Sequence, residues 1–536
     1  MMPVLKKLSF LYNPYVLTVL TLGYLTSEMG HFMIGVTSKA TATDTHYGDI
    51  ACQYNMSDSF QEFNFTLFSN CDAAKTEEAC ANLTLDDGTR YCEFAHNGKG
   101  VDYQIIAGPS FIAVYSIVGI FFGILADKYN RVALCAVCFL IIGVSFALTG
   151  AATSFWQLLV LRMILACGEA GVNPLATGIL SDIFNEEKRA LVLSLFNWGI
   201  YAGIGLSYPV GRYITELDLW DLGWRTPYYL TGVIAFLVAI FCAFTLSEPK
   251  RKMIGEEVEE KAEEQVNGTP QKEEEPKTGE WKAMVQPRVL MLFVAAAIRH
   301  TGGLCFTYNA DLFYREVFPD WDLSWMLFFV TFIIGAIGVV FGGMISDKVV
   351  EKYGTKTRVA VLAVSQLIAT PFAFGSIYMG PIGAMVTLAI SYLFAEMWFG
   401  ILFAILVEVV PLSVRSTTIG VFLFVMNMVG GNLPILVEPV RTSSSFADAL
   451  AIFYAGAYLI SSVLFGLVLV MPGKKKKDQS APLPMKAGIE NGGFTTIEKL
   501  PLLRTPMESR MAILMRVITY KLKLVQFSYS LFLRVM

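Results

Sequence analysis

The stretch FGILADKYNR, Phe122–Arg131, ends an apolar run with one acidic and two basic residues, at the place where a membrane-spanning helix would meet water. Part of it, GILADK, recurs as GMISDK at Gly343–Lys348, 220 residues further along the chain. A glycine there lets another helix approach closely, and basic residues hold such a turn at the cytosolic surface. The alternative is a turn that only follows the usual distribution of basic residues. Two copies at equivalent positions favour a gating motif that latches two halves of the molecule in one state, made of Gly123, Asp127, Lys128, Arg131, Gly343, Asp347 and Lys348.

The composition places the chain in a lipid bilayer. Hydrophobic residues make up 54% of the 536 residues, charged residues only 16%, and the mean hydropathy is +0.53. A helix needs about 20 mainly apolar residues to cross the hydrocarbon. Twelve such windows are present, covering 14–37, 104–126, 132–150, 156–181, 190–213, 227–246, 288–310, 324–346, 358–378, 381–409, 417–437 and 448–471. We therefore expect an all-α polytopic membrane protein with twelve transmembrane helices.

The twelve spans divide into two related sets of six. Glu169 and Glu396 are 227 residues apart, and Arg189 and Arg415 are 226 apart, close to the offset of the repeated motif. Nearly constant offsets indicate a duplicated unit, and many secondary transporters consist of two such halves with the binding site between them. We predict two pseudo-symmetric six-helix bundles. The expected parts are a cytosolic N-terminus at 1–13, bundles at 14–246 and 288–471, a charged cytosolic linker at 247–287 and a cytosolic tail at 472–536.

The segment 38–103 is expected on the non-cytosolic side, because the basic residues of the short loops collect on the other side of the membrane. It carries eleven acidic and four basic residues. Glycosylation acceptor sequences occur in it at Asn55, Asn64 and Asn82, a modification of non-cytosolic loops. An even set of cysteines, Cys52, Cys71, Cys80 and Cys92, predicts disulfide bonds whose pairing the sequence leaves open.

Five stretches resemble the major facilitator superfamily, and the resemblance covers about residues 12 to 471. They are GILADKYNR, LRMILACGEAG at Leu161–Gly171, GWRTPYYLTGV at Gly223–Val233, SEPKRK at Ser247–Lys252, and LFAEMWFGILFAILVEVVPLSVRST at Leu393–Thr417. Within the superfamily the chain is similar to the spinster-like branch. This resemblance implies proton-linked transport of sphingolipids or lysophospholipids, often in late endosomes and lysosomes. In the first span, where the family has an acid followed by arginine, the chain has Glu28 with no arginine after it.

Charged residues inside the spans are the candidates for transport chemistry, because an ion at the bilayer centre costs about 2.5 to 3.5 kcal/mol on insertion scales. Arg162 and Glu169 are seven residues apart, so one face of a helix carries both, and Glu169 falls near mid-depth. We expect Glu169 to bind a proton in one access state and to release it when Arg162 or Arg299 comes nearer. The alternative is a static ion pair that only orders helices.

The second half offers Arg299, also near mid-depth. It suits an anionic headgroup such as a phosphate, or it pairs with Glu396 or Glu28. Trp398 and Phe399 follow Glu396 and are expected nearest a ligand. His31 and His300 suit proton work, but a lone buried histidine is more often a packed, hydrogen-bonded residue.

The tail contains EKLPLL, with Glu498, Leu502 and Leu503 in the form of a dileucine sorting signal that clathrin adaptors recognise. Residues 511–536 suit a helix on the membrane surface. The expected location is a lysosomal, late endosomal or plasma membrane.

Other classes of function lack support in the sequence. There is no phosphate-binding glycine loop, no metal-ligand spacing of His, Glu or Cys, and no nucleophile elbow. We therefore expect neither an enzyme nor a cofactor, metal or nucleic-acid partner. The partners expected are the bilayer, protons and a small amphiphilic or anionic substrate. Two alternatives to a lipid transporter stay open, a carrier of organic anions or small metabolites and a receptor or scaffold that does not transport.

Overall fold

The computed structural model describes residues 9–54, 65–86, 88–184, 186–249, 284–354, 357–410 and 415–471. Met1–Gly473 form one compact unit. Several predictions fall outside the described residues. These are the glycosylation sites Asn55 and Asn64, most of the linker, the sorting signal at Glu498, Leu502 and Leu503, and the helix at 511–536.

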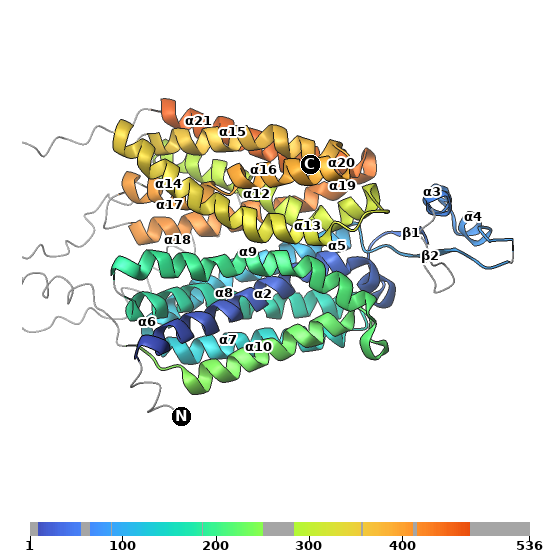
Figure 1. The fold of residues 1–536 in the computed structure, drawn as a ribbon, viewed down its shortest axis with the longest axis horizontal. Coiled ribbons are helices and arrows are strands. Elements are labelled where there is room, and N and C mark those ends of the chain that lie inside the picture. Colours follow the sequence, from blue (N-terminus) through green and yellow to red (C-terminus); the bar gives the residue numbers. More distant parts are fainter. Residues whose placement is uncertain are drawn as a thin grey trace, which may run out of the picture. The chain divides into compact units, whose positions relative to one another are not determined.

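Six helical segments form the N-terminal half (Figure 1). They are α2 (Ser9–Thr45), α5 (Val101–Ala107) continued by α6 (Pro109–Lys128), α7 (Arg131–Gly150), α8 (Phe155–Ile183), α9 (Glu186–Glu216) and α10 (Arg225–Thr245). The 3-10 turn η1 (Leu219–Asp221) lies between α9 and α10. Each of the first six predicted spans falls on one segment. The ends agree to within four residues except in α2, which begins five residues before and ends eight residues after the predicted span.

Six further segments form the C-terminal half, and four of them are interrupted. They are α12 (Pro287–Val317); α13 (Ser324–Phe329), η3 (Val330–Gly335) and α14 (Ala336–Tyr353); α15 (Thr357–Tyr378); α16 (Pro381–Ala395) and α17 (Trp398–Val409); α18 (Arg415–Val425), η5 (Met426–Gly430), η6 (Leu433–Leu436) and α19 (Val437–Ser443); and α20 (Phe446–Leu450), η7 (Ala451–Gly456) and α21 (Ala457–Val470). These match the last six predicted spans.

Among the described residues, ten of these twelve segments are long and apolar enough to cross a membrane. The other two, α2 and α9, are 37 and 31 residues long and carry more polar residues. In α2 the polar side chains of the middle of the helix are buried inside the protein, among them Ser27, Glu28 and His31, whereas Thr18, Thr43 and Asp44 toward its ends are exposed. A helix that turns its polar residues inward does not expose them to lipid, so the architecture of twelve helices in two bundles is confirmed.

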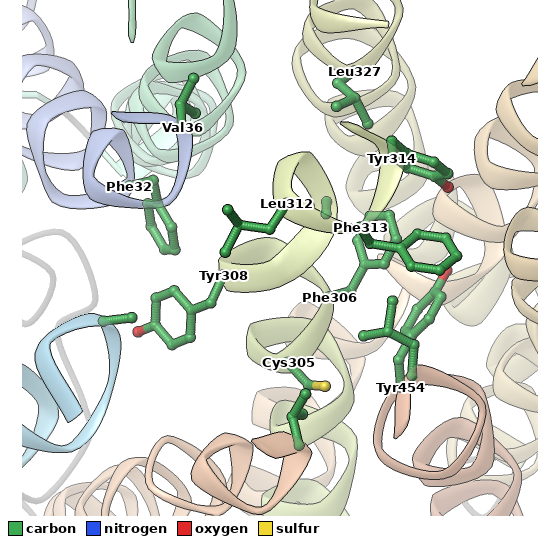
Figure 2. Packing of buried hydrophobic residues seen from close by; sticks show 14 of the residues in the cluster. Phe32, Val36, Cys305, Phe306, Tyr308, Leu312, Phe313, Tyr314, Leu327 and Tyr454 are labelled. Atoms are coloured by element: carbon green, nitrogen blue, oxygen red, sulfur yellow. The ribbon is translucent and has the colours of Figure 1, made fainter. Parts of the chain in front are cut away.

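The two halves share one hydrophobic core, whose buried residues come from α2, α5, α8 and α9 on one side and from α12 to α21 on the other. In Figure 2, Tyr308 and Leu312 of α12 extend toward Phe32 and Val36 of α2. Within the N-terminal half, α2 and α9 approach so closely that a methyl group on Gly203 would lie 2.5 Å from the carbonyl oxygen of Leu25. This packing brings the polar residues of α2 into the middle of the molecule.

The segment between the first two spans is shorter than predicted, because α2 continues to Thr45 and α5 begins at Val101. It also adds a two-stranded antiparallel sheet to the otherwise helical fold, in which β1 (Ile50–Tyr54) pairs with β2 (Cys92–His96) and Cys52 lies opposite Phe94. Two short helices, α3 (Phe65–Ala73) and α4 (Glu77–Ala81), complete it. Disulfide bonds join Cys52 to Cys80 and Cys71 to Cys92. Asn82 is exposed directly after α4. We call the end of the bundle that carries this segment the loop end.

Candidate functional site

A cluster of ionisable side chains lies between α2 and α8 in the N-terminal half. Glu169 of α8 is only 3% exposed. Its Oε2 accepts a hydrogen bond from the Ser27 hydroxyl at 2.7 Å, and its Oε1 lies 3.0 Å from Nδ1 of His31. Glu28 completes the cluster, since the carboxylate and imidazole atoms of Glu28, His31 and Glu169 all lie within 4.8 Å of one another. We call these three residues, with Arg162, the N-terminal centre.

Arg162 occupies a different position from the one expected. Its guanidinium donates to backbone carbonyl oxygens, at 2.9 Å to Ile106, 3.3 Å to Ala107 and 2.9 Å to His31. Ile106 and Ala107 end α5, where the chain breaks at Gly108 before α6 begins. Arg162 therefore satisfies carbonyl groups that this break leaves without helical partners.

The direct contact between Arg162 and Glu169 is absent from the described residues, so the static ion pair is wrong for this conformation, whereas the approach of Arg162 in another access state stays a prediction. Seven residues of helix separate the two Cα atoms by about 10 Å along the axis, and both side chains find nearer partners. Arg162 is still connected to the other members of the N-terminal centre, because it donates a hydrogen bond to the backbone carbonyl of His31.

The C-terminal half has its own charged cluster, which we call the C-terminal centre. Nη2 of Arg299 donates to Oε1 of Glu396 at 3.0 Å and to the carbonyl oxygen of Ala395 at 2.8 Å. Its guanidinium lies over the rings of Trp398 and Tyr458, 4.7 and 4.6 Å from their centroids. Of the two carboxylate partners that the sequence left open for Arg299, the structure thus shows Glu396. The tenth span is interrupted here, because α16 ends at Ala395 and α17 begins at Trp398.

Each centre touches the opposite half of the molecule. The hydroxyl of Tyr201, on α9, donates to Oε2 of Glu396 at 3.1 Å. The ring of Tyr308, on α12, lies 6.1 Å from the ring of His31 and 5.5 Å from that of Phe32. Both centres therefore lie at the interface between the halves and face neither lipid nor an isolated helix bundle, which is where alternating access requires coupling groups.

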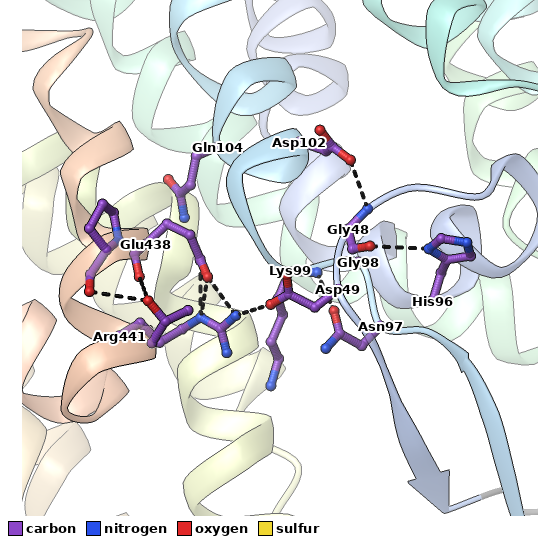
Figure 3. A network of polar contacts seen from close by, with 12 residues as sticks. Gly48, Asp49, His96, Asn97, Gly98, Lys99, Asp102, Gln104, Glu438 and Arg441 are labelled. Atoms are coloured by element: carbon purple, nitrogen blue, oxygen red, sulfur yellow. Dashed lines mark hydrogen bonds and ion pairs between the residues drawn. The ribbon is translucent and has the colours of Figure 1, made fainter. Parts of the chain in front are cut away.

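The interface is closed at the loop end. A buried hydrogen bond joins the side chains of Gln104 and Asn309 at 2.7 Å. Around it, three ion pairs cross between the halves: Lys99 with Glu316, Arg212 with Asp322, and Asp49 with Arg441. Figure 3 shows the third, in which Arg441 also holds Glu438 of its own helix. No other ion pair between described residues crosses the interface, so these charge contacts concentrate at one end.

The repeated gating motif lies at the opposite end, and its described contacts stay within each half. Arg131 pairs with Asp182 at 2.7 Å and with Glu248 at 2.7 Å. In the second copy, Arg358 pairs with Asp347 at 2.7 Å. Lys128 is exposed, and the Asp127 side chain lies outside the described residues.

The close helix approach predicted for the motif glycines is wrong for this conformation. A methyl group on Gly123 or on Gly343 would meet no atom within 4 Å. Whether the motif latches the two halves in another state remains a prediction.

The sequence left open whether His31 works with protons or is a packed, hydrogen-bonded residue. The structure shows it buried and in direct contact with Glu169, which fits either interpretation. Trp398 is buried against Arg299 as expected of a site residue, whereas Phe399 is 39% exposed and contacts Phe403 and Trp398. A signal for His31 was present, since Glu28 and His31 are three residues apart and share a helix face.

Two helical bundles with buried ionisable residues at their interface define a secondary transporter. The family profile of the Major Facilitator Superfamily matches residues 20–435, and the chain belongs to this superfamily.

Among curated proteins, the chain is similar to Protein spinster of Drosophila melanogaster, with 24% identity over 320 residues, which are 57% of this chain and 50% of that protein. The match thus spans about half the length of this relative.

Solved structures show the same fold. One is a bacterial homologue of the human lysosomal transporter Spinster in an inward-facing, unoccupied conformation, with a TM-score of 0.59 and 18% identity, covering 86% of this chain and 96% of that one. Another is the inward-open xylose transporter XylE of E. coli, with a TM-score of 0.60 and 15% identity, covering 87% and 98%. The family and the fold establish a multi-pass membrane transporter and not an enzyme.

Proposed function

We propose that this transporter is proton-linked and moves lipid-like amphiphiles, a lysophospholipid or a sphingolipid, by alternating access. The observation that carries the proposal is the placement of two buried charged centres at the interface of the halves, one of them built from Glu28, His31 and Glu169. Ionisable groups inside membrane spans are expensive, and they commonly mark substrate or proton pathways. Contacts at the loop end hold the halves together there, which fits a state open toward the other end.

The cargo proposal rests on the C-terminal centre and on the similarity to spinster proteins. Arg299 offers a planar, permanently charged group beside the aromatic rings of Trp398 and Tyr458. Such a site suits an anionic headgroup joined to an apolar chain. The same arginine supports a second candidate, a carrier of small organic anions, which would need the charge and not the apolar surface.

The orientation follows from the same reasoning. We place the loop end on the non-cytosolic side, where disulfides persist, with Asn82 available for glycosylation. The gating motif then faces the cytosol and, in the opposite access state, latches the two halves. A lysosomal or late endosomal membrane is the proposed location, supported by the similarity to spinster proteins, and clathrin adaptors are the proposed partners of the tail.

Proton coupling is tested by the substitution Glu169→Gln, which keeps the size of the side chain and the acceptor for Ser27 but cannot exchange a proton. In vesicles with an imposed pH gradient, the variant should lose gradient-dependent accumulation and keep exchange at equal pH. Glu396→Gln is the matched control and should retain gradient dependence. Unchanged gradient dependence in Glu169→Gln would remove Glu169 from the coupling role.

The cargo is tested by loading vesicles with lysophospholipids, sphingoid bases and organic anions in parallel and following their export. Export of the amphiphiles alone supports the lipid proposal, and export of the anions alone favours the second candidate. A receptor or scaffold would bind saturably and move none of them.

A further inference from the structure

His31 sits at the point where the N-terminal centre meets the opposite half. Its Nδ1 lies 3.0 Å from Oε1 of Glu169. Its ring packs between Phe32 and Phe111, with centroids 4.4 and 3.8 Å away, and Tyr308 of the C-terminal half lies beyond at 6.1 Å. The ring of His31 thus contacts the Glu169 carboxylate on one side and lies next to the interface between the two halves on the other.

The titratable and charged groups around this ring come from every helix packed against it. Glu28 lies on α2 itself, Glu169 and Arg162 on α8, and Tyr308 on α12, while Tyr115 of α6 interacts with the two carboxylates. Two carboxylates therefore share one fixed cation, Arg162, whose hydrogen bonds go to the backbone. One further positive charge or one bound proton is needed to balance them, and His31 is the group within reach that can supply either.

The second ring nitrogen of His31 makes this balance depend on conformation. Nε2 is buried and has no hydrogen-bond partner among the described residues. A neutral imidazole with its proton on Nδ1 tolerates this, because Nε2 then carries only a lone pair. An imidazolium would bury an unsatisfied N–H, which is unfavourable for a neutral group and more so for a charged one. If Tyr308 moves away from the ring, water can reach Nε2. If the tyrosine turns instead, its hydroxyl, which has no hydrogen-bond partner among the described residues, can bind Nε2.

We propose that His31 is the proton carrier of the N-terminal centre and that the separation of the two halves around Tyr308 controls its charge; this inference rests on the proposed proton coupling. With the interface open, neutral His31 carries its proton on Nε2, toward water, and accepts a hydrogen bond at Nδ1 from protonated Glu169. The O–H bond of Glu169 then breaks as an N–H bond forms at Nδ1, which gives a carboxylate and an imidazolium. The Nε2 proton passes to water, and the imidazole that remains, with its proton on Nδ1, is the form that the closed interface tolerates. Glu28 receives or supplies the next proton, three residues along the same helix face.

The test compares two histidine variants of the full chain in vesicles, His31→Gln and His300→Gln, with a fluorescent lysophospholipid as the probe. Glutamine at position 31 keeps a hydrogen bond to Glu169 but cannot carry a proton, so a purely structural role would survive the change. We expect His31→Gln to lose gradient-driven accumulation and to show a flat exchange rate between about pH 5 and 8, the range in which histidine changes charge. His300→Gln, the other histidine within a span, should keep the pH profile of the unchanged protein.

A second readout does not depend on cargo. The chain contains only four histidines, so nitrogen NMR of histidine-labelled protein in nanodiscs can assign His31 by its loss in His31→Gln. Its titration should shift in Glu169→Gln and stay in place in Glu396→Gln. The proposal is overturned if the titration of His31 is unchanged in Glu169→Gln. It is also overturned if His31→Gln keeps gradient-dependent accumulation. Neither outcome argues against proton coupling itself. Absence of gradient dependence in the unchanged protein overturns the proposed function itself.

Discussion

In the N-terminal half, Glu169 on the fourth helix faces His31 from the first helix, and in the C-terminal half, Glu396 on the fourth helix faces Arg299 from the first. The acids repeat, but their partners differ. Histidine gains and loses its charge near neutral pH, whereas arginine stays charged. The duplicated unit thus has a titratable partner in one half and a fixed cation in the other, which fits the proposal that the N-terminal centre couples protons and the C-terminal centre binds an anion.

The backbone around the acid also differs between the two centres, and this difference fits the same division of roles. Glu169 lies inside the uninterrupted helix α8, whereas Glu396 lies at the break between α16 and α17. At that break the carbonyl oxygen of Ala395 accepts hydrogen bonds from Arg299 and from Gln366. Interrupted helices at membrane depth often mark a substrate site, because the freed polar groups are available to a ligand. The C-terminal centre therefore combines the features expected where cargo binds.

The largest effect is expected from Arg299→Met, which removes the fixed cation. Glu396 would remain buried with no opposite charge, and breaking one side of a buried ion pair costs about 3 to 5 kcal/mol. Thermal unfolding in detergent should show a marked loss of stability. Exchange of the probe should fail as well, because the anion-binding group is gone.

The double variant Arg299→Met with Glu396→Gln provides the control. Removing both charges leaves no unpaired ion, so stability should recover in large part while exchange stays lost. Equal stability of the single and double variants would show that Arg299 acts through packing between Trp398 and Tyr458 and not through its charge.

A smaller effect is expected at the two copies of the gating motif. Arg131 is 7% exposed and holds two acids, Asp182 and Glu248. Arg131→Ala should destabilise the protein by about 1.5 to 3 kcal/mol, the range for hydrogen bonds to charged groups. Near the second copy, Arg358 donates to the Ser346 hydroxyl at 3.0 Å and pairs with Asp347, whose side chain is 71% exposed. An exposed pair contributes only about 0 to 1 kcal/mol, so Arg358→Ala should destabilise the protein less than Arg131→Ala. Chemical unfolding of both variants measures the difference, and equal losses would contradict it.

The sequence predicted the parts of this architecture that repeat or that follow hydropathy. Twelve apolar windows located twelve helical segments, and the offset between Glu169 and Glu396 placed them in equivalent helices. It could not predict partners that depend on how helices meet. Glu169 reaches His31 across 138 residues, and Arg162 reaches carbonyl groups freed by a break at Gly108. The disulfide pairing likewise depends on how β1 pairs with β2, and no pattern of apolar residues predicted that sheet.

The smallest effect is expected at the loop end, and it tests whether pH acts through the N-terminal centre alone. Asp322 lies between α12 and α13. It accepts a hydrogen bond from the Tyr213 hydroxyl at 2.5 Å and forms an ion pair with Arg212 at 3.1 Å. Burial by itself raises the pKa of Asp322, but the hydrogen bonds from Tyr213 and Ser324 and the charge of Arg212 outweigh it, so the pKa falls below its ordinary 3.8.

A carboxylate with a lowered pKa stabilises its contacts at every pH above the ordinary value and loses them only as the pH falls through the lowered one. Acidification of the loop side from about pH 7 to 5, a range in which histidine titrates, should therefore leave this contact unchanged. The fluorescence of Trp325, whose ring stacks 6.0 Å from that of Tyr213, reports it as the difference between the unchanged protein and Trp325→Phe. Asp322→Asn should weaken the contact by about 0.2 to 1 kcal/mol at both pH values. A pH-dependent Trp325 signal that disappears in Asp322→Asn would place a second proton-sensitive element at the loop end and would end the division of roles between the two centres.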